Sequence, residues 1–243
     1  MAKVIHFISD LHLSEEQPKL LNLLEHFLTK IAPESDQLFV LGDLFELWVG
    51  DDHHTPFNQK VVELFSSYTA KGGELLVGHG NRDFLIGEAF SKSCGASLLA
   101  EPFNFEWEDK SVCLMHGDSL CTDDVAYQQL RQMVRNPQWQ QEFLSQPVEA
   151  RLAFAASLRE QSKSAMQEKA SEIMDVNQDA VVEAIQANQC DWLIHGHTHR
   201  PDTHTIDIDG NEHLRIVLSD WGDKGQYLVF EDGRFESRYF DLK

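Results

Sequence analysis

Two imidazoles, His197 and His199, follow an apolar run at a spacing that suits a metal ion held at the end of a strand. The run, 190–194, is typical of a buried strand. Gly196 leaves room for a close approach to this strand end. The dipeptide 200–201, Arg-Pro, is expected to end regular pairing.

Four other apolar runs stop at metal-type side chains in the same way. The runs 4–9, 38–41, 74–77 and 111–115 all predict strands. Each such side chain is weak evidence alone, because a lone Asp-x-His is commonly a turn and a strand His is more often a core residue. Together they indicate one shared site. The candidate ligands are Asp10, His12, Asp43, Asn81, His116, His197 and His199.

The candidate ligands are all oxygen and nitrogen donors, a set that suits Mn²⁺, Fe²⁺ or Zn²⁺. They are too many for one ordinary ion and fit two ions that share a carboxylate. Two ions roughly 3.5–4 Å apart polarise a phosphoryl oxygen and hold hydroxide for in-line attack. The carboxyl ends of the strands in parallel α/β sheets are where such sites form.

Strands and helices alternate along the first part of the chain, which predicts an α/β fold with parallel strands. Apolar residues recur at helical spacing over 20–28 and 61–65, between successive strands. Later runs at 214–218, 226–230 and 235–240 predict further strands. No internal repeat or linker is present, so residues 1–243 are expected to form a single domain.

The composition excludes a general nucleic-acid scaffold, because Lys+Arg 20 against Asp+Glu 40 gives −20 and would repel a phosphate backbone. No apolar stretch approaches the ~20 residues that span a bilayer, and no leader-like region opens the chain. The cysteines form no Cys-x-x-Cys pair. Reduced, mostly buried thiols are therefore expected rather than a zinc pair of Cys113 with His116.

From about residue 122 to 188 the chain becomes a helical block without glycine, broken at Pro137 and Pro147. Its first part, about 122–170, is predicted to be an inserted helical lid over the active site. Its last helix, 176–187, is expected to return to the main layer. Four lid residues share one helical face: Arg159, Ser162, Met166 and Lys169. Such a charge pattern alone is typical of an ordinary solvated face.

The ordered motifs Asp10-x-His12, Gly42-Asp43, Gly80-Asn81, His116 and Gly196-His197-x-His199 resemble the signature of the calcineurin-like metallophosphoesterases. The resemblance covers nearly the whole chain. It implies an αββα sandwich, two packed mixed sheets flanked by helices, that carries two metal ions. It assigns Asp10, His12, Asp43 and His199 to one ion. It assigns Asp43 (as the bridge), Asn81, His116 and His197 to the other. The catalytic residues it implies are Asp43, Asn81, Arg82 and His116.

Arg82 departs from the superfamily signature, which commonly has His after Gly-Asn. That His assists the leaving group, which matters when a basic alkoxide departs. A phosphate monoester, with a second pKa near ~6, leaves without a proton. A guanidinium that stabilises phosphoryl charge therefore indicates cleavage of a pyrophosphate rather than an alkyl phosphodiester. The alternative is a surface ion pair between Arg82 and Asp83.

The Gly-Asn-Arg-Asp variant, the segments 116–118, 121–124 and 194–201, and the helical insertion resemble one branch of the superfamily, the pyrophosphatases of lipid A biosynthesis. The resemblance implies that two Mn²⁺ ions support hydrolysis of UDP-2,3-diacylglucosamine. The products are UMP and 2,3-diacylglucosamine 1-phosphate (lipid X), and water attacks the phosphorus nearer uridine. The matching substrate-binding positions are Asn81, Arg82, Asp124, Arg159, Ser162, Lys169 and His197. Met166 stands where a polar side chain would otherwise reach the glucosamine.

A lipid substrate requires an apolar cavity and work at a membrane surface. The candidate acyl contacts are Phe84, Leu85, Ile86, Trp139, Phe143 and Phe154, although aromatic residues at helical spacing are more often plain core. Without a spanning helix, the protein is expected to be peripheral on the cytoplasmic face of the inner membrane. No obligate protein partner is implied.

Two alternatives remain open from the sequence. One is another metallophosphoesterase, such as a nucleotide pyrophosphatase or a cyclic-nucleotide phosphodiesterase, against which Arg82 and the lid argue. The other is a metal-poor protein-binding scaffold, which should have lost ligands that this chain retains. Outside the ligand set, His195 and His79 are expected to orient the loops that carry ligands. Surface or packing roles are expected for the remaining histidines.

Overall fold

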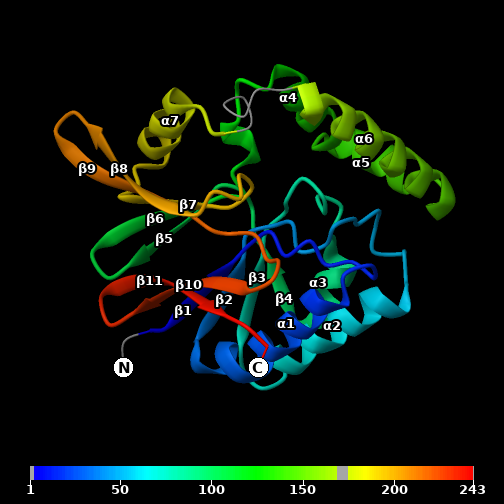
Figure 1. Cartoon of the computed structure of the whole chain (residues 1–243), viewed down its shortest axis with the longest axis horizontal. Helices are drawn as coiled ribbons and strands as arrows, with labels where there is room; N and C mark the ends of the chain where they lie inside the picture. Colours follow the sequence, from blue (N-terminus) through cyan, green and yellow to red (C-terminus); the bar gives the residue numbers. More distant parts are fainter. Residues whose placement is uncertain (1–2, 169–174, 243) are drawn as a thin grey trace.

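Two mixed β-sheets pack face to face at the centre of the molecule, with helices on their outer sides (Figure 1). The computed structural model describes residues 3–168 and 175–242, and for 161–168 the backbone alone. The first sheet has the strand order β11-β10-β1-β2-β3-β4, and the second has β5-β6-β7-β9-β8. The strands are β1 (Ile5–Ile8), β2 (Gln37–Val40), β3 (Glu74–Val77), β4 (Ala96–Leu98), β5 (Phe103–Trp107), β6 (Lys110–Leu114), β7 (Trp192–His195), β8 (Asp202–Ile208), β9 (Asn211–Val217), β10 (Gly225–Glu231) and β11 (Arg234–Phe240). The predicted α/β sandwich of two mixed sheets is confirmed.

The strands that lead to the candidate ligands run parallel to their neighbours. In the first sheet β1, β2, β3 and β4 pair in parallel, and in the second β6, β7 and β9 do so. The antiparallel strands lie toward the edges, with β10 and β11 in the first sheet and β5 and β8 in the second. Parallel strands end at the same edge of a sheet, so the residues that follow β1, β2 and β3 meet there.

Side chains of the central strands alternate between two buried faces. In β2, Phe39 belongs to the apolar layer between the sheets, whereas Leu38 and Val40 pack in the layer that includes the helices. In β1, Phe7 belongs to the inner layer and stacks on Phe39 with ring centroids 5.2 Å apart, while Ile8 faces the helices. Covering both faces explains why these strands are continuous apolar runs.

Helices cover the outer face of each sheet. The first sheet packs against α1 (Pro18–His26), α2 (Pro56–Thr69) and α3 (Glu88–Cys94), and the second against α7 (Gln178–Asn188) (Figure 1). A π-helical turn (Phe27–Ile31) and 3-10 turns (Ala32–Glu34 and Asp118–Leu120) complete these connections. A separate group contains α4 (Val125–Val134), α5 (Pro137–Leu144) and α6 (Val148–Glu168), which lie together beyond the sheets (Figure 1).

The boundaries of α4, α5 and α6 follow local sequence signals. The side chain of Asn136 accepts hydrogen bonds from the backbone N–H groups of Gln138 and Trp139, and Pro137 is the first residue of α5. α6 begins at Val148, directly after Pro147. The predicted breaks at the two prolines are therefore confirmed.

Several elements carry too little apolar pattern to be predicted. β4 is three residues long, and β8 is an edge strand with mostly exposed side chains. Arg200 and Pro201 lie outside regular pairing, as expected, and the next strand, β8, starts directly after them at Asp202, opposite β9. α3 and β5 were also not predicted.

The cysteines behave as the composition suggests. Cys94, Cys113, Cys121 and Cys190 are all free and buried. Burial raises the pKa of the Cys94 thiol to about 11. A thiol with this pKa stays protonated near neutral pH and packs as a small apolar group.

Candidate metal centre

The loops that follow β1 and β2 run side by side and carry the first candidate ligands. Beyond the strands, the N–H of Asp10 donates to the carbonyl of Gly42 at 3.1 Å. The N–H of His12 donates to the carbonyl of Asp43 at 3.0 Å. This continued backbone pairing brings the carboxylates of Asp10 and Asp43 to one edge of the first sheet.

Glycines allow the ligand loops to touch one another directly. A Cβ at Gly80 would lie 2.0 Å from Oδ1 of Asp43, and one at Gly42 would lie 2.4 Å from the backbone nitrogen of Gly80. A Cβ at Gly196 would lie 2.1 Å from Oδ2 of Asp10. These distances are below any tolerable contact, so the Gly-Asp, Gly-Asn and Gly-His pairs of the sequence are required by close packing.

Most candidate ligands stand in a left-handed backbone conformation. The φ angle is 55° at Asp10, 48° at His12, 49° at Asp43, 65° at His197 and 54° at His199. This region is sparsely populated by residues other than glycine, and a strain of about 1–3 kcal/mol each persists only where the surroundings impose it. Its concentration at these positions indicates a functional site.

A first group of donors contains Asp10, His12 and His199, whose ligand atoms lie within 4.8 Å of one another. Nε2 of His12 lies 3.2 Å from Nε2 of His199, which lies 3.4 Å from Oδ1 of Asp10. A carboxylate faces the other nitrogen of each ring. Nδ1 of His12 is 2.8 Å from Glu46, and Nδ1 of His199 is 3.5 Å from Asp220. Such partners orient imidazoles for metal binding.

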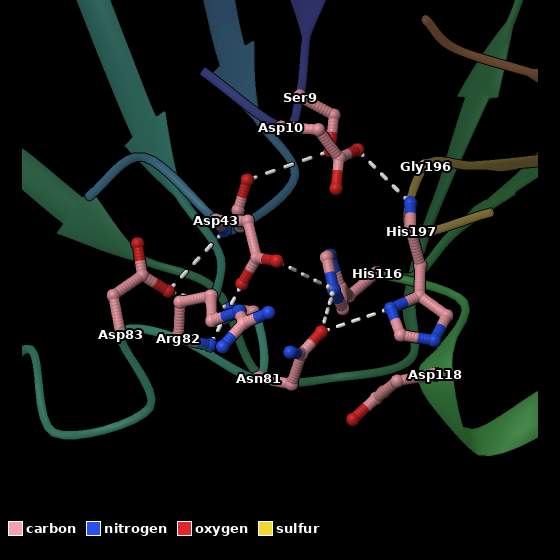
Figure 2. A network of polar contacts seen from close by, with 12 residues as sticks. Ser9, Asp10, Asp43, Asn81, Arg82, Asp83, His116, Asp118, Gly196 and His197 are labelled. Carbon is pink, nitrogen blue, oxygen red and sulfur yellow. Dashed lines mark hydrogen bonds and ion pairs between the residues drawn. The ribbon is translucent and has the colours of Figure 1, made fainter. Parts of the chain in front are cut away.

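A second group contains Asp10, Asp43 and His116, again within 4.8 Å of one another. Two further candidates join it, because Oδ1 of Asn81 lies 3.0 Å from Nε2 of His116 and 2.8 Å from Nδ1 of His197. Figure 2 shows these side chains turned toward one another from the ends of separate strands.

Asp10 belongs to both groups, and Asp43, a member of the second, also approaches the first. Oδ2 of Asp43 is 3.7 Å from Nε2 of His12 and 3.8 Å from Nε2 of His116, nearly the same distance from each. The structure therefore brings every ligand candidate that the sequence predicts into two adjoining groups of side chains.

The donor set fits divalent cations. Oδ1 of the fully buried Asp10 has no hydrogen-bond partner, and an unpaired buried carboxylate oxygen is costly. Two buried carboxylates, Asp10 and Asp43, face imidazoles that have their other nitrogens hydrogen-bonded. Carboxylate, amide and imidazole donors without thiolate match Mn²⁺, Fe²⁺ or Zn²⁺.

The electrostatics of the site reflect the cost of burying several charges. Burial raises the pKa of Asp43 to about 6, even though the charges of His116 and His12 oppose this. Burial alone would lower the pKa of His116, but the charges of Asp43 and Asp10 outweigh it and raise the pKa to about 9. Burial, aided by the charge of His116, lowers the pKa of His197 to about 3.

Asp83 fixes the loops from inside the protein. It is fully buried, and its carboxylate accepts hydrogen bonds from backbone N–H groups in both ligand loops. These donors are Asp43 at 3.3 Å, Leu44 at 2.7 Å, Phe45 at 3.2 Å and Gly80 at 2.8 Å. A surface ion pair of Asp83 with Arg82 is therefore excluded.

Arg82 faces the site without a side-chain partner for its Nε, which is buried and makes no hydrogen bond. Its backbone N–H donates to Oδ1 of Asp43 at 2.8 Å. Figure 2 shows its side chain beside Asn81 and Asp43. The guanidinium thus lies next to the candidate ligands, as the sequence predicts.

Asp118 connects α4 to the same site. It is fully buried, and it accepts hydrogen bonds from the hydroxyl of Tyr127 at 2.6 Å and from Nε of Arg131 at 2.9 Å. Directly after the end of α4, Arg135 donates to the carbonyls of His79 at 3.2 Å and Gly80 at 3.0 Å. These bonds hold α4 against two of the loops that carry ligands.

α6 is held at two further places. Arg151 is buried, pairs with Asp52 and donates to the carbonyl of Val49 at 2.6 Å. Arg159 donates through one nitrogen to the carbonyl oxygen of Glu46 at 2.9 Å and to its Oε1 at 2.6 Å. The helices of the predicted lid therefore contact the loops that follow β2, β3 and β6.

The remaining predicted substrate contacts divide into two sets. Asp124 caps α4 by accepting the N–H of Tyr127 at 3.1 Å. The side chains of Ser162 and Met166, and the whole of Lys169, lie outside the described residues.

The predicted acyl contacts all belong to one apolar core against the first sheet or pack against it. Leu85, Ile86 and Phe143 are buried members of this core, and Phe84, Trp139 and Phe154 pack against it. The aromatic candidates form a cluster between α5, α6 and the loop after β3. Its members are Trp139, stacked on Phe143 at 4.8 Å; Phe154, 5.3 Å from Phe143; and Phe84, 6.4 Å from Trp139.

Two histidines outside the ligand set hold loops, as expected. Nδ1 of His195 donates to the carbonyl of Gly196 at 2.8 Å, and its Nε2 accepts from Arg215 at 3.3 Å. Nε2 of His79 donates to the carbonyl of Ile86 at 2.7 Å.

Three acids have positioning roles that the sequence does not predict. Glu46 follows Leu44 and Phe45, Asp83 follows Arg82, and Asp118 follows Gly117. An isolated acid in an apolar stretch, as in Leu44-Phe45-Glu46-Leu47, is the signal that could have found Glu46.

The fold and the donor set define a metallophosphoesterase. The family model for calcineurin-like phosphoesterases matches residues 3–201, and the chain belongs to this family. The family implies a divalent metal centre, for which the groups around Asp10 and Asp43 are candidate ligands.

Curated relatives narrow the comparison within the family. A protein named UDP-2,3-diacylglucosamine hydrolase from Hahella chejuensis is 46% identical over 97% of this chain and 95% of its own length. A protein of the same name from Haemophilus influenzae is 46% identical over 89% of this chain and 90% of its own. Another from Proteus mirabilis is 41% identical over 95% of this chain and 96% of its own.

Proposed function

We propose that this protein hydrolyses the pyrophosphate bond of UDP-2,3-diacylglucosamine and releases UMP and 2,3-diacylglucosamine 1-phosphate. The observation that carries the proposal is the grouping of two carboxylates, four imidazoles and one amide at strand ends, in which Oδ2 of Asp43 lies near both His12 and His116, with Arg82 alongside. The names of the full-length relatives support the choice of substrate. Together they support a proposal in which this site carries out the chemistry and the reaction belongs to lipid A biosynthesis.

In this proposal two Mn²⁺ ions are held by the ligand set. Asp10, His12, Asp43 and His199 would hold one ion, and Asp43, Asn81, His116 and His197 would hold the other. The approach of Oδ2 of Asp43 to both His12 and His116 supports its proposed role as the bridge. Bound ions would supply Lewis acidity toward the phosphoryl oxygens and activate water for in-line attack.

Arg82 is proposed to stabilise charge on the pyrophosphate. Its side chain lies beside Asn81 and Asp43 (Figure 2), and its buried Nε has no partner in the described residues. Guanidinium presents planar, permanently charged donors that match phosphoryl oxygens. Because the departing sugar phosphate is a weak base, this site needs a charge stabiliser more than a proton donor.

The helices α4, α5 and α6 are proposed to form the lid over the lipid part of the substrate. The aromatic cluster of Phe84, Trp139, Phe143 and Phe154 supports an acyl-chain contact, since it joins the lid to the loop that carries Arg82. Asp124, Arg159, Ser162, Lys169 and His197 are proposed to contact the polar part.

A peripheral location on the cytoplasmic face of the inner membrane belongs to the same proposal. In the part of the chain that the structure describes, no helix is long and apolar enough to cross a bilayer. Val125, Met133 and Leu144 are exposed apolar side chains of α4 and α5. Apolar residues on lid helices suit a substrate that is taken from a membrane surface.

Hydrolysis in ¹⁸O-labelled water tests the reaction and the direction of attack. Purified protein with Mn²⁺ is incubated with UDP-2,3-diacylglucosamine, and both products are weighed by mass spectrometry. Label on UMP is expected, because water attacks the phosphorus nearer uridine. Label on the lipid phosphate alone would contradict the proposed direction.

A substrate panel separates this reaction from the alternatives. UDP-glucose, a dinucleotide polyphosphate and a cyclic nucleotide are offered under the same conditions. Turnover of UDP-2,3-diacylglucosamine should exceed that of the others by at least ~100-fold, because only this substrate fills both the metal site and the lid. Faster turnover of a cyclic nucleotide would overturn the proposal.

A further inference from the structure

We infer that Glu46 is a positioning residue that orients His12 for one metal ion, and that Arg159 couples this metal site to α6. The inference rests on the proposed metal ligation. It adds Glu46 as the residue that orients the ligand His12, and Arg159 as the contact between α6 and Glu46. It depends on the contacts of one carboxylate with two different elements.

The backbone fixes Glu46 beside His12. The segment that follows β2 continues alongside the segment that follows β1, with a parallel bridge between Leu13 and Phe45. The N–H of Leu13 donates to the carbonyl of Leu44 at 3.0 Å, and the N–H of Glu46 donates to the carbonyl of Leu13 at 3.1 Å. This register brings Glu46 to His12 without any contribution from the lid.

The two oxygens of Glu46 then serve different partners. Oε2 accepts from Nδ1 of His12 at 2.8 Å, and Oε1 accepts from Arg159 at 2.6 Å. A proton on Nδ1 of His12 leaves the lone pair on Nε2, the atom that faces Asp10 at 3.9 Å and Asp43 at 3.7 Å. Glu46 thus selects the tautomer and ring orientation that metal binding needs.

Arg159 holds Glu46 from α6. Nη2 of Arg159 donates to both the carbonyl oxygen and the carboxylate of Glu46. These two bonds fix the direction in which the Glu46 side chain leaves the backbone. Arg159 and Glu46 are partly exposed, so this ion pair contributes little to folding. Its effect is expected instead in the orientation of His12, through the carboxylate that both share.

A series of contacts, from Arg159 on α6 to Glu46 and from Glu46 to His12, therefore joins the lid to the first group of donors. By linkage, an ion that prefers the oriented His12 also favours the docked position of α6, and the two effects are reciprocal. The second group, around Asn81, His116 and His197, has no contact with Glu46 in the described residues. We therefore expect Glu46 to affect the affinity for the metal ion held by His12 and not the affinity for the other ion.

Calorimetric titration of Mn²⁺ into the metal-free protein, without substrate, measures both affinities. Glu46→Ala should weaken one of the two binding events by about 10–100-fold and leave the other unchanged. Glu46→Gln, whose amide oxygen still accepts from His12, should retain more affinity than Glu46→Ala. Unchanged affinity in Glu46→Ala, or equal losses in the Ala and Gln variants, would overturn the positioning role.

A double-mutant cycle tests the connection to α6. Arg159→Ala should weaken the same binding event by a smaller factor, and adding it to Glu46→Ala should cause no further loss, because the shared carboxylate is already gone. Additive losses would overturn the coupling. The matched control is Arg238→Ala, which removes an arginine paired with Glu236 on β11 at 2.7 Å, far from the ligands in sequence and in the sheet.

Hydrogen exchange provides a readout that does not depend on catalysis. Mn²⁺ should slow exchange in α6 over residues 148–160 of the wild-type protein and not in Glu46→Ala. Circular dichroism confirms that each variant is folded. If the protein binds Mn²⁺ as described and fails to hydrolyse UDP-2,3-diacylglucosamine, the proposed function fails and this inference stands. If hydrolysis occurs and Mn²⁺ does not change hydrogen exchange in α6, the coupling is wrong and the proposed function stands.

Discussion

A methyl group on Gly196 would lie 2.1 Å from Oδ2 of Asp10, so the loop after β7 is in direct contact with the end of β1. The N–H of His197 donates to the same oxygen at 2.9 Å. This contact joins the two sheets at the metal centre. It also leaves Oδ1 of Asp10 as the oxygen that faces His12 and His199.

Gly196→Ala should therefore lower turnover by at least ~100-fold, because the new methyl group displaces Asp10 or the loop that carries His197 and His199. Metal content should fall with it, measured by elemental analysis after dialysis against Mn²⁺. The matched control is Gly222→Ala, where a Cβ meets nothing within 4 Å. Normal metal content in Gly196→Ala would show that the contact is dispensable.

The arrangement of the ligands along the chain was predictable from the sequence. Apolar runs that stop at Asp10, Asp43 or Asn81 predict strands whose ends share a sheet edge, and β1, β2 and β3 have that arrangement in the first sheet. The run that stops at His116 is β6, which lies in the second sheet. Continuous apolar runs are informative here because both faces of each strand are buried. The sandwich itself came from the family resemblance rather than from periodicity.

Asp43→Asn should abolish measurable turnover, a loss of at least ~1,000-fold, while the protein remains folded. The amide keeps an oxygen that can accept the N–H of Arg82 but loses the charge proposed to bridge two ions. Since burial raises the pKa of Asp43 to about 6, the metal-free protein at pH 8 bears the cost of a buried charge. Asp43→Asn removes that cost, so its metal-free unfolding temperature should equal or exceed that of wild type.

The control for Asp43→Asn is Asp232→Asn, at a turn between β10 and β11 where φ is 48° and asparagine is tolerated. That variant should keep full activity. A clear loss of metal-free stability in Asp43→Asn would mean that the carboxylate is needed for folding rather than for the ions.

Arg82→Lys should lower kcat by about 10–100-fold with a smaller change in KM. Lysine keeps the positive charge but presents a compact ammonium in place of a planar fork. If Arg82 stabilises charge that develops on the phosphoryl group, the loss lies mainly in kcat. Steady-state kinetics with UDP-2,3-diacylglucosamine make the measurement. A loss confined to KM would assign Arg82 to ground-state binding alone.

The bonds that orient the ligands could not be predicted in the same way. Glu46 reaches His12 because two loops pair beyond their strands, and Asp83 reaches four backbone N–H groups because it is buried between loops. Such contacts depend on the register of irregular segments, which has no periodic pattern in the sequence. The edge strand β8 was missed for a related reason, since its exposed side chains hide its pairing.

Burial of His6 should make the folded protein less stable as the pH falls below 6.5. Its side chain is buried in β1 against the rings of Tyr227, 4.9 Å away, and Phe27, 5.9 Å away. Burial, aided by the charge of Arg238, lowers its pKa from 6.5 to about 4. Between these values the unfolded chain binds a proton that the folded protein excludes. The contribution of His6 is therefore complete above pH 6.5 and is lost as the pH falls toward 4.

His6→Phe keeps an aromatic ring in this position and removes the titration. Urea unfolding at pH 7 and pH 4.5 should show a smaller loss of stability in the variant than in wild type. The difference should be on the order of 2–3 kcal/mol, since one pKa unit corresponds to about 1.4 kcal/mol. Metal-free protein is used at both pH values, so that protons and ions do not compete. His54→Phe, at an exposed position, controls for the added ring. An identical pH dependence in His6→Phe and wild type would show that His6 takes up its proton without leaving the core.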